Sequence, residues 1–427
     1  MAAVVQVVGS SRPVRAEDLP RLRGVLGTPS LAWRDGDVSF RGSGEAAVLA
    51  GARADDVLGR AAASSVDVRG ERMAPPGEWF AGFAFDAAAP RDGWWESFPA
   101  ARAFLPRLLL ASSPLGGSLT AYEPLGAGGE QAARRRADDA LRSALSCPAP
   151  REPAASPPRP ASLCEDFPAW EALVVRALEV LHQGMLRKVV LARAIDVEAE
   201  APLDLALALE RAESSADGAV VYAVRGADGT AFLGASPERL ARVEGRRFVT
   251  QALAASAAPE DAARLARSAK ETAEHRAVVE DIRDALEGIA ERVEVAGTSA
   301  VSLGYVTHLD ARIEGTLRGG VRPHQLALAL HPTAAVGGSP RERARDFLRR
   351  HEHLARGWYA GAVGWVGEAA LDLRVALRCA LLRGPSARLF VGAGVVEGST
   401  ARAEWEETRR KAVPMLRALL GEAPWPR

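Results

Sequence analysis

Two pairs of glutamates stand three residues apart in segments that read as helices. Glu271 and Glu274 lie in SAKETAEH, and Glu404 and Glu407 lie in ARAEWEET. Residues three apart share one helix face, so two such helices facing each other would form the all-oxygen site that Mg²⁺ prefers. The alternative is a pair of solvated helix faces, the commoner role of such pairs, and Lys411 stands four residues after Glu407 as an ordinary helix ion pair.

Lysine is rare in this chain, which makes its positions informative. Only Lys188, Lys270 and Lys411 are lysines among 54 basic residues. Arginine serves wherever only positive charge is needed, so a lysine indicates a compact ammonium or a group that can lose its proton. Lys188 opens an apolar run that reads as a buried strand, where desolvation favours the neutral amine and a role as general base. A lysine whose ammonium reaches solvent at the strand end is the alternative.

Residues 371–382 predict one long strand, because apolar and polar residues alternate. Arg378 then shares a polar face with Asp372 and Arg374, and its guanidinium could hold a carboxylate through two hydrogen bonds. A strand with one solvated face is the alternative. His308, which precedes another alternating strand, is either a buried structural histidine or a site residue.

Two further motifs resemble known sites but lack the necessary spacing. The glycines at 392, 394 and 398 give GxGxxxG and not the dinucleotide fingerprint GxGxxG, so we reject a Rossmann site. His351 and His353 stand two residues apart, and such side chains diverge on a helix, which argues against a metal site.

Hydrophobic periodicity predicts the elements that must position these residues. The predicted helices span residues 168–186, 260–291, 324–330, 341–355 and 401–420. The predicted strands span residues 79–85, 104–110, 188–197, 219–224, 231–234, 240–243, 248–253, a pair within 301–313, 361–366, 371–382 and 388–396. Strands with intervening helices but without regular βαβ alternation indicate an α+β fold with a large, mainly antiparallel sheet.

The composition excludes several classes of protein. The 427 residues carry 54 basic and 54 acidic side chains, and a net charge of zero offers no basic face, so we expect no nucleic-acid partner. Apolar runs stay well short of the ~18 residues of a membrane span, and the N-terminus lacks a secretory n-region, so we expect no membrane association. Cys147, Cys164 and Cys379 form neither a disulfide framework nor a metal motif, so we expect a cytoplasmic location.

A proline-rich stretch divides the chain. Residues 148–162 read PAPREPAASPPRPAS, which predicts an exposed linker or long surface loop. We therefore expect an N-terminal segment of residues 1–147, a linker over 148–163 and a C-terminal segment of residues 164–427.

The order of the motifs resembles one family, the chorismate-utilising enzymes, and within it the isochorismate synthases. The matching stretches are RKVVLARAI (187–195), FLGASPERL (232–240), SAKETAEH (268–275), THLDARIEGTL (307–317), LHPTAAVGGSP (330–340), RGWYAGAVGW (356–365), VALRCA (375–380) and LFVGAGVVEGSTARAEWEETRRK (389–411). WFAGFAFD (79–86) and FLPR (104–107) resemble the family more weakly, which implies that residues 1–147 complete the same fold. That fold is a large, mainly antiparallel sheet layered with helices, as in anthranilate synthase component I.

The resemblance implies a Mg²⁺ site for the ring carboxylate of chorismate. Glu274 and Glu407 look like the metal ligands, with Glu271 and Glu404 as their supporting partners. The enolpyruvyl carboxylate would be held by Arg378, Tyr359 and the backbone of Gly392, Ala393 and Gly394.

The same resemblance assigns the proton transfers. Lys188 looks like the base that activates water for attack at C2, and Glu238 looks like the acid that protonates the departing C4 hydroxyl. His308 lines the same pocket in relatives. The implied activity is Mg²⁺-dependent conversion of chorismate to isochorismate, feeding menaquinone, siderophore or salicylate biosynthesis.

Two positions bear on the subfamily. Relatives that use ammonia lack the strand lysine, so Lys188 favours water, and no glutaminase subunit is expected. Ala335 stands where lyases that eliminate pyruvate tend to carry threonine, which favours release of isochorismate. We expect a monomer or weak dimer.

Two alternatives stay open. One is a salicylate or aminodeoxychorismate/anthranilate-type synthase. The other is a catalytically weak chorismate-binding protein, because ALAASAAPED at 252–261 departs from the family pattern, with Ala255 where glycine is expected.

Overall fold

The computed structural model describes residues 4–126, 128–148, 157–257, 262–303 and 306–421. For a few residues in these ranges, Glu274 among them, only the backbone is described. Within this part of the chain the strands form two large sheets, sheet A with 13 strands and sheet B with 10. Neighbouring strands are antiparallel except for β1 and β5, so the predicted α+β class with a mainly antiparallel core is confirmed.

Sheet A contains strands from both ends of the chain. In spatial order these are β10 (Pro160–Cys164), β11 (Lys188–Ala199), β23 (Ser386–Val395), β22 (Cys379–Arg383), β13 (Ala231–Ser236), β12 (Val220–Arg225), β2 (Leu31–Asp35), β3 (Val38–Ser43), β8 (Leu108–Ser113), β9 (Gly116–Pro124), β1 (Gln6–Val14) and β5 (Ser65–Arg69), with the short β19 (Gly338–Ser339) on β11.

Sheet B likewise combines strands from the N-terminal and C-terminal segments. Its order is β16 (Ala290–Val295), β18 (Val306–Leu317), β15 (Arg247–Ala257), β14 (Arg239–Glu244), β21 (Ala370–Val375), β20 (Ala362–Val366), β6 (Trp79–Phe83), β7 (Ala101–Leu105) and β4 (Ala47–Gly51), with β17 (Ser299–Leu303) on β18.

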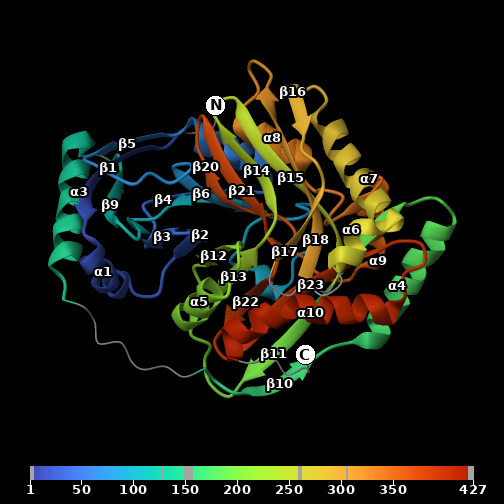
Figure 1. Cartoon of the computed structure of the whole chain (residues 1–427). Coiled ribbons are helices and arrows are strands. Elements are labelled where there is room, and N and C mark those ends of the chain that lie inside the picture. The colour runs from blue at the N-terminus through green and yellow to red at the C-terminus, as the bar shows by residue number, and fades with distance from the viewer. Residues whose placement is uncertain (1–3, 127, 149–156, 258–261, 304–305, 422–427) are drawn as a thin grey trace.

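Helices cover the outer faces of the two sheets (Figure 1). They are α1 (Leu19–Leu26), α2 (Ala54–Ala63), α3 (Gly129–Ser146), α4 (Phe167–His182), α5 (Leu205–Ser214), α6 (Ala262–Arg267), α7 (Ala269–Leu286), α8 (Pro323–Leu330), α9 (Arg341–His351) and α10 (Ala401–Leu420), with 3₁₀ turns at Ala16–Asp18 and Gly93–Trp95. Helix α10 packs against β23 and α5, and α7 packs against β15.

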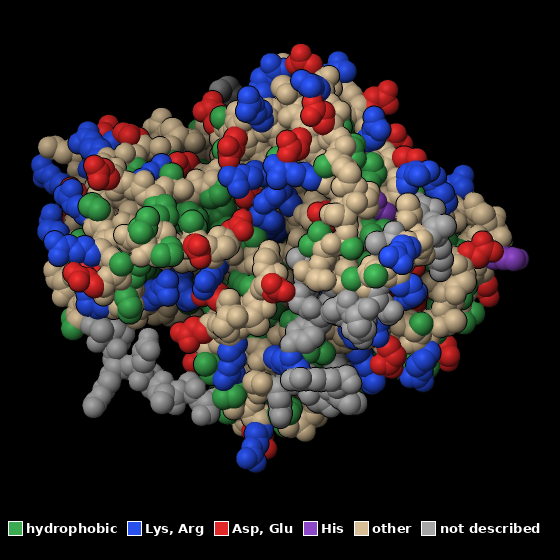
Figure 2. Space-filling model, viewed as in Figure 1, with side chains coloured by type: hydrophobic (Ala, Val, Ile, Leu, Met, Phe, Trp, Pro, Cys, Tyr) green, Lys and Arg blue, Asp and Glu red, His purple; other side chains and the backbone are tan. Residues whose placement is uncertain are grey.

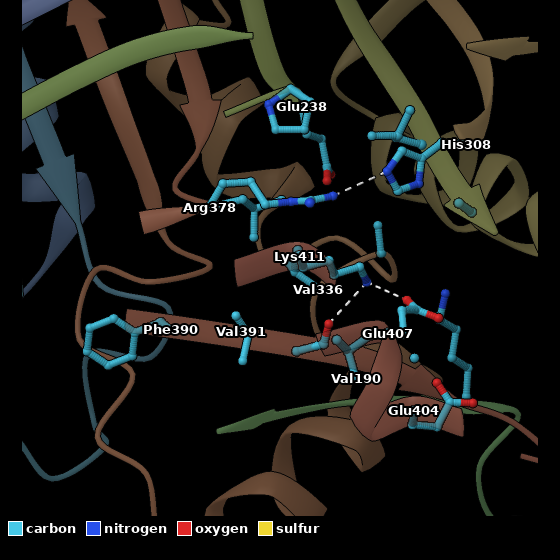
Figure 3. Close-up of a pocket in the computed structure, with 18 of the residues that line it drawn as sticks. Val190, Glu238, His308, Val336, Arg378, Phe390, Val391, Glu404, Glu407 and Lys411 are labelled. Carbon is cyan, nitrogen blue, oxygen red and sulfur yellow. Dashed lines mark hydrogen bonds and ion pairs between the residues drawn. The ribbon is translucent and has the colours of Figure 1, made fainter. Parts of the chain in front are cut away.

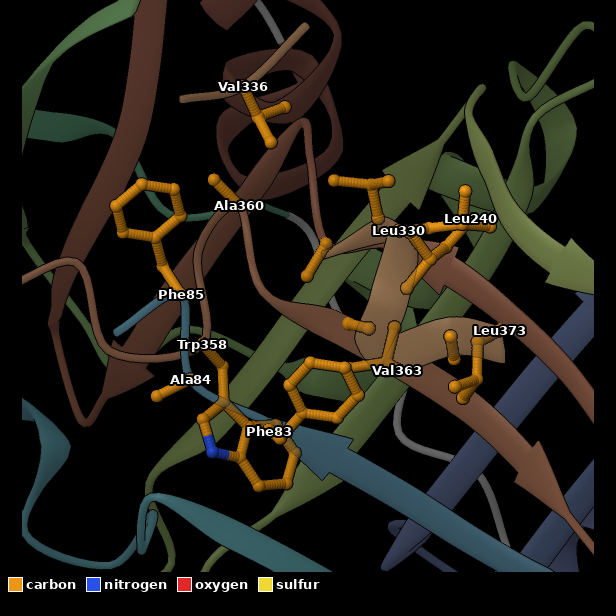
Figure 4. Close-up of a cluster of buried hydrophobic side chains, with 14 of the residues drawn as sticks. Phe83, Ala84, Phe85, Leu240, Leu330, Val336, Trp358, Ala360, Val363 and Leu373 are labelled. Carbon is orange, nitrogen blue, oxygen red and sulfur yellow. The ribbon is translucent and has the colours of Figure 1, made fainter. Parts of the chain in front are cut away.

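Large aromatic side chains fill the space between the sheets. Trp33 of sheet A meets Phe80 of sheet B edge to face with ring centroids 5.9 Å apart, and Phe40 of sheet A meets Trp365 of sheet B in the same way at 5.3 Å. Such contacts add to the stabilisation from burial of apolar area. A neighbouring apolar cluster, shown in Figure 4, joins Phe83 of β6 to Val363 of β20 and Leu330 of α8. Residues far apart in the chain thus share one core.

The N-terminal segment supplies strands to both sheets. Trp33 of β2 is the register partner of Tyr222 of β12, and Phe80 of β6 is the partner of Trp365 of β20. Strands from the first 147 residues therefore continue both sheets that the C-terminal segment begins. The division of the chain into segments at the proline-rich linker stays a prediction.

Two of the places where the chain passes from one sheet to the other lie next to each other. It leaves sheet A after β13 and enters sheet B at β14, and it leaves sheet B after β21 and enters sheet A at β22. The two crossings are hydrogen-bonded to each other, because the Val375 amide donates to Glu238 O at 3.1 Å and the Ala235 amide to Arg378 O at 3.1 Å. Each crossing carries one of the predicted site residues, Glu238 or Arg378.

The second crossing corrects one prediction. Residues 371–382 are two strands in different sheets, and Asp372 and Arg374 are buried rather than on a solvated face. Arg378 lies between the strands with a φ of 49°. This turn, and not strand alternation, sets the direction of the Arg378 side chain. The prediction failed because alternation along the sequence cannot reveal that the chain changes sheet.

Two other predicted elements are also wrong in extent. The helix expected over 260–291 is broken at Ser268, whose extended backbone starts a second helix and whose hydroxyl accepts from the Glu271 amide at 3.3 Å. It ends at Leu286, and the unpredicted strand β16 follows. The strand expected over 104–110 is likewise two strands, because Pro106 and Arg107 separate β7 of sheet B from β8 of sheet A. Helix α10, by contrast, has the predicted bounds.

The face shown in Figure 2 carries basic and acidic side chains side by side. On sheet B a groove of about 720 Å³ is lined by five arginines and three glutamates. Three of the arginines pair with a glutamate of the same strand, as Arg242 with Glu244 at 2.6 Å, so the groove is a polar face on which arginines outnumber glutamates. Among the described residues, no helix is both long and apolar enough to cross a membrane.

Candidate active site

One cavity of about 170 Å³ receives side chains from both sheets and from α7 and α10 (Figure 3). Its predicted lining residues are Lys188, Glu238, Glu271, His308, Ala335, Tyr359, Arg378, Gly392, Gly394, Glu404 and Glu407. The fold therefore brings together residues that are up to 219 positions apart, from Lys188 to Glu407.

Lys188 enters the cavity from the start of β11 and is only 8% exposed. It is therefore buried, and the interpretation of a solvated lysine at the strand end is wrong. Gly394 of the neighbouring strand β23 makes room for it, because a Cβ there would lie 2.7 Å from Lys188 Cε. The glycine pattern that imitates a dinucleotide fingerprint thus leaves space beside the lysine.

Glu238 lies at the crossing from β13 to β14 and is 3% exposed. Burial raises its pKa to about 8, although attraction to Lys188 and a hydrogen bond from the Thr333 hydroxyl, 3.4 Å from Oε1, act in the opposite direction. Desolvation penalises the carboxylate, so this group holds a proton near neutral pH. It has the protonation state that a general acid requires.

Arg378 lies at the second crossing, between the two sheets. Its Nη2 donates to His308 Nε2 at 3.4 Å, since a guanidinium has no acceptor (Figure 3). Burial lowers the pKa of Arg378 to about 10, while attraction to Glu407 and Tyr359 acts in the opposite direction. Arg378 is still charged at neutral pH, so a fixed, desolvated cation faces the cavity.

Tyr359 and Gly392 form an adjoining part of the wall. The Tyr359 ring stacks on Phe390 with centroids 5.5 Å apart, and a Cβ at Gly392 would lie 2.7 Å from the Tyr359 hydroxyl. Ala393, expected beside them, sends its side chain into the hydrophobic core, as strand alternation requires.

Two helices bring carboxylates to the same cavity. Glu271 comes from the first turn of α7, and Glu404 and Glu407 come from α10, whose start is capped by the Thr400 hydroxyl. The side chain of Glu274 lies outside the described residues. The predicted ion pair is confirmed: Lys411 Nζ lies 2.5 Å from Glu407 Oε1 and also donates to Gly392 O at 3.1 Å.

These donors are of the type that Mg²⁺ binds. Three carboxylates reach one cavity, and the ammonium of Lys411 already lies against one of them, so this wall accommodates a cation. As placed, no three acidic, histidine or cysteine side chains of the described residues stand close enough together to hold a metal ion. The donor chemistry fits a magnesium ion, and the fourth expected carboxylate, Glu274, falls outside what the structure describes.

Several residues in the cavity wall or in contact with it were not predicted. Lys411 was interpreted as an ordinary helix ion pair, yet its ammonium faces the cavity. Thr333, which contacts Glu238, stands in the quoted motif LHPTAAVGGSP, and that position was the available signal. The altered stretch 252–261 contributes Leu253 and Ala254 to the wall, while the side chain of Ala255 and residues 258–261 lie outside the described residues.

A family model described as "Chorismate binding enzyme" matches residues 52–420 of the chain. The chain belongs to the chorismate binding enzymes. The resemblance that the sequence motifs carry is confirmed, and the match begins well before the proline-rich linker.

The chain is similar along most of its length to several named enzymes and solved structures. The chain is 35% identical to the salicylate biosynthesis isochorismate synthase of Pseudomonas aeruginosa, over 92% of this chain and 85% of that protein. It is 33% identical to the isochorismate synthase MenF of Bacillus subtilis, over 80% and 74% respectively. The solved structure of MenF, the menaquinone-specific isochorismate synthase from Escherichia coli, matches with a TM-score of 0.80 and 26% identity, covering 98% of this chain and 95% of that one. Anthranilate synthase component I from Streptococcus pneumoniae matches with a TM-score of 0.70 and 25% identity over 82% of each chain.

Proposed function

We propose that this chorismate binding enzyme is an isochorismate synthase, which adds water at C2 of chorismate and removes the C4 hydroxyl. The observation that carries the proposal is the pairing, in one cavity, of the buried amine of Lys188 with the buried, proton-holding carboxyl of Glu238. The relatives named isochorismate synthases support the same reaction. The use of the product in menaquinone, siderophore or salicylate biosynthesis stays a prediction.

The charges of the cavity suit a substrate with two carboxylates. Arg378 and the adjoining Tyr359 would hold the enolpyruvyl carboxylate, because a guanidinium matches a carboxylate with two parallel hydrogen bonds. The ring carboxylate would lie towards α7 and α10. That end of the cavity carries the glutamates, so direct contact would be repulsive unless a cation intervenes.

A magnesium ion held by Glu407, Glu404, Glu271 and Glu274 would supply that cation and would polarise the ring carboxylate. The residues of the chain do the remaining work. Lys411 balances the charge of Glu407, and its hydrogen bond to Gly392 O holds the ammonium in place. Both helices begin at capped ends, so the backbone of the first turns that carry Glu271 and Glu404 is held in place.

Lys188 and Glu238 would carry the two proton transfers. Lys188 takes a proton from the water that attacks C2. Glu238 gives its proton to the C4 hydroxyl as that group leaves, and the double bonds of the ring shift between the two positions. Burial keeps the carboxyl group of Glu238 protonated near neutral pH, so a proton is available for the leaving hydroxyl.

The proposal is tested by incubating the purified protein with chorismate and Mg²⁺ and separating the products by chromatography. We expect isochorismate, without pyruvate and without a requirement for ammonia. Salicylate with pyruvate, or turnover only with ammonia, would replace the proposal by one of the sibling activities. Tight binding of chorismate without any product would indicate a binding protein.

Two substitutions at one position separate charge from base catalysis. Lys188→Met removes both the charge and the base, and Lys188→Arg keeps a charge that cannot accept a proton. We expect kcat to fall about 100-fold or more in both variants, within the range of general base catalysis. Full activity of Lys188→Arg would exclude Lys188 as the base.

A further inference from the structure

A buried ion pair lies just outside the cavity, at the end of α9. Glu352 and Arg356 are each 4% exposed in their side chains, and the guanidinium binds both carboxylate oxygens, at 2.5 and 2.8 Å. Neither residue lines the cavity. Burying two charges gains little net stability over apolar side chains of similar size, so such a pair calls for another role.

The pair also binds the backbone of two separate segments. Arg356 donates to Val336 O at 3.0 Å through Nη1 and to Val190 O at 2.7 Å through Nη2. Glu352 Oε2 accepts from the Ala192 amide at 2.8 Å. The guanidinium carbon lies 4.3 Å from the centre of the Phe85 ring, and Figure 4 shows Phe85 and Val336 on the same side of the core.

These contacts fill a gap along the edge of β11. One edge of β11 pairs with β23 from Val189 to Glu198. The other edge pairs with β19 only at residues 188–189 and with β10 only at residues 196–199. Val190 O and Ala192 N lie between those two partners, where a buried backbone group without a hydrogen bond would be unfavourable. The ion pair takes the place of the missing strand.

Both segments that the pair joins are walls of the cavity. The β11 segment carries Lys188 and Val190, and the segment 333–337 carries Ala335, Val336 and Thr333, the residue that contacts Glu238. A single guanidinium therefore bridges the side of the cavity that holds the amine and the side that holds the acid.

We propose that Glu352 and Arg356 are positioning residues that fix the strand of Lys188 against the loop of Thr333, and through Thr333 the carboxyl group of Glu238. This inference rests on the proposed function, because Lys188 and Glu238 need fixed relative positions only if both transfer protons on one substrate. The guanidinium is suited to this task, since its planar fork reaches a carboxylate and two carbonyls at once, whereas an ammonium cannot span them.

The test compares Arg356→Lys with a matched control, Arg102→Lys. Arg102 is also a buried arginine: it binds Glu45 and, at 3.3 Å, Arg225 O, and it lies 4.7 Å from the centre of the Phe104 ring, but it does not line the cavity. We expect both variants to fold with a lowered Tm. Only Arg356→Lys should lose kcat, by about 10- to 100-fold, as expected when reacting groups are misplaced by about 1 Å, with KM for chorismate changed less than threefold.

A second measurement does not depend on activity. The Val190 amide donates to Gly337 O at 3.0 Å, directly between the two segments. Its hydrogen exchange should accelerate about tenfold or more in Arg356→Lys and stay unchanged in Arg102→Lys. Unchanged exchange, or a kcat as high as that of the control, would overturn the inference.

A wild-type protein that does not convert chorismate would instead contradict the proposed function, while the exchange result would still decide the inference. If Arg356→Lys does not fold, Glu352→Gln gives the same test. It keeps the volume and an acceptor for the Ala192 amide but removes the charge that aligns the guanidinium. Faster Val190 exchange supports the inference, and wild-type exchange overturns it.

Discussion

Arg378 of the cavity wall and Ala360, the neighbour of a wall residue, adopt the left-handed backbone conformation without being glycine. Their φ angles are 49° and 58°, and Ala360 directly follows Tyr359. Such conformations cost free energy and persist only where the surroundings enforce them. Here the Ala360 amide donates to Ala376 O at 2.8 Å and Arg378 O accepts from Ala235, so the two turns are held by their neighbours. The sequence indicates which side chain is needed at 378 but not the turn that aims it.

The raised pKa of Glu238 predicts a pH dependence of stability. Its pKa is 4.5 in an exposed carboxyl and about 8 in the folded protein, because burial disfavours the carboxylate. Between these values the folded state binds a proton that the unfolded state has released, so this contribution to stability is full below about pH 4.5 and is lost as the pH rises through about 8. We expect the Tm of the wild type to fall more than that of Glu238→Gln between pH 6 and about 8.5. Parallel curves for the two proteins would contradict a raised pKa.

The same carboxyl predicts the alkaline limit of activity. A general acid acts only while it holds its proton, so kcat/KM for chorismate should decline above about pH 8, the pKa of Glu238 in the free enzyme. The measurement is a pH–rate profile at saturating Mg²⁺. A profile that stays flat to pH 10 would exclude Glu238 as the acid.

Among the elements, the pairing of β11 with β23 gives a sharp prediction. Gly394 leaves the space that Lys188 occupies, so Gly394→Ala should displace the amine, since its Cβ would lie 2.7 Å from Lys188 Cε. We expect kcat to fall about 10- to 100-fold, because a proton acceptor displaced by about 1 Å is misplaced for the reaction. Gly319→Ala is the matched control, because a Cβ at Gly319 meets no atom within 4 Å. Equal activities of the two variants would contradict the role given to Gly394.

Elements with a local signal at both ends were predictable from the sequence. Helix α10 follows Thr400, a hydroxyl cap, and ends before Gly421, which has a φ of 80°. Ser268 is also a hydroxyl cap, but the alanine and glutamate residues on both sides of it favour helix and conceal the break. Pro237 indicates a break at the crossing 236–239 but not a change of sheet, and the crossing at 375–379 has no local signal. Neighbours from distant parts of the chain decide which sheet a strand joins.

At the scale of the whole molecule, the two sheets are continuous across the N- and C-terminal segments. Residues 164–427 alone would expose the edges of β12 and β20, and the core would lose Trp33 and Phe80. We therefore expect this fragment to lack a cooperative unfolding transition, because exposed sheet edges and lost apolar burial both disfavour the isolated piece.

The converse experiment keeps both pieces. Co-expression of residues 1–147 with residues 157–427, which keep β10, should restore chorismate conversion, since the division falls in the proline-rich stretch where a break in the chain is best tolerated. Activity and unfolding are measured on the co-purified pair. A fragment 164–427 that unfolds cooperatively and is fully active by itself would show that the N-terminal strands are dispensable.

The most direct test follows the oxygen atom in the product. The central claim is that a buried base and a buried acid on separate elements add solvent water at C2 while the original hydroxyl leaves from C4. Chorismate is incubated with the protein and Mg²⁺ in ¹⁸O-labelled water, and the isochorismate is analysed by mass spectrometry. We predict a product two mass units heavier, with the label on the C2 hydroxyl. Unlabelled isochorismate, which requires transfer of the substrate's own hydroxyl, would contradict the claim.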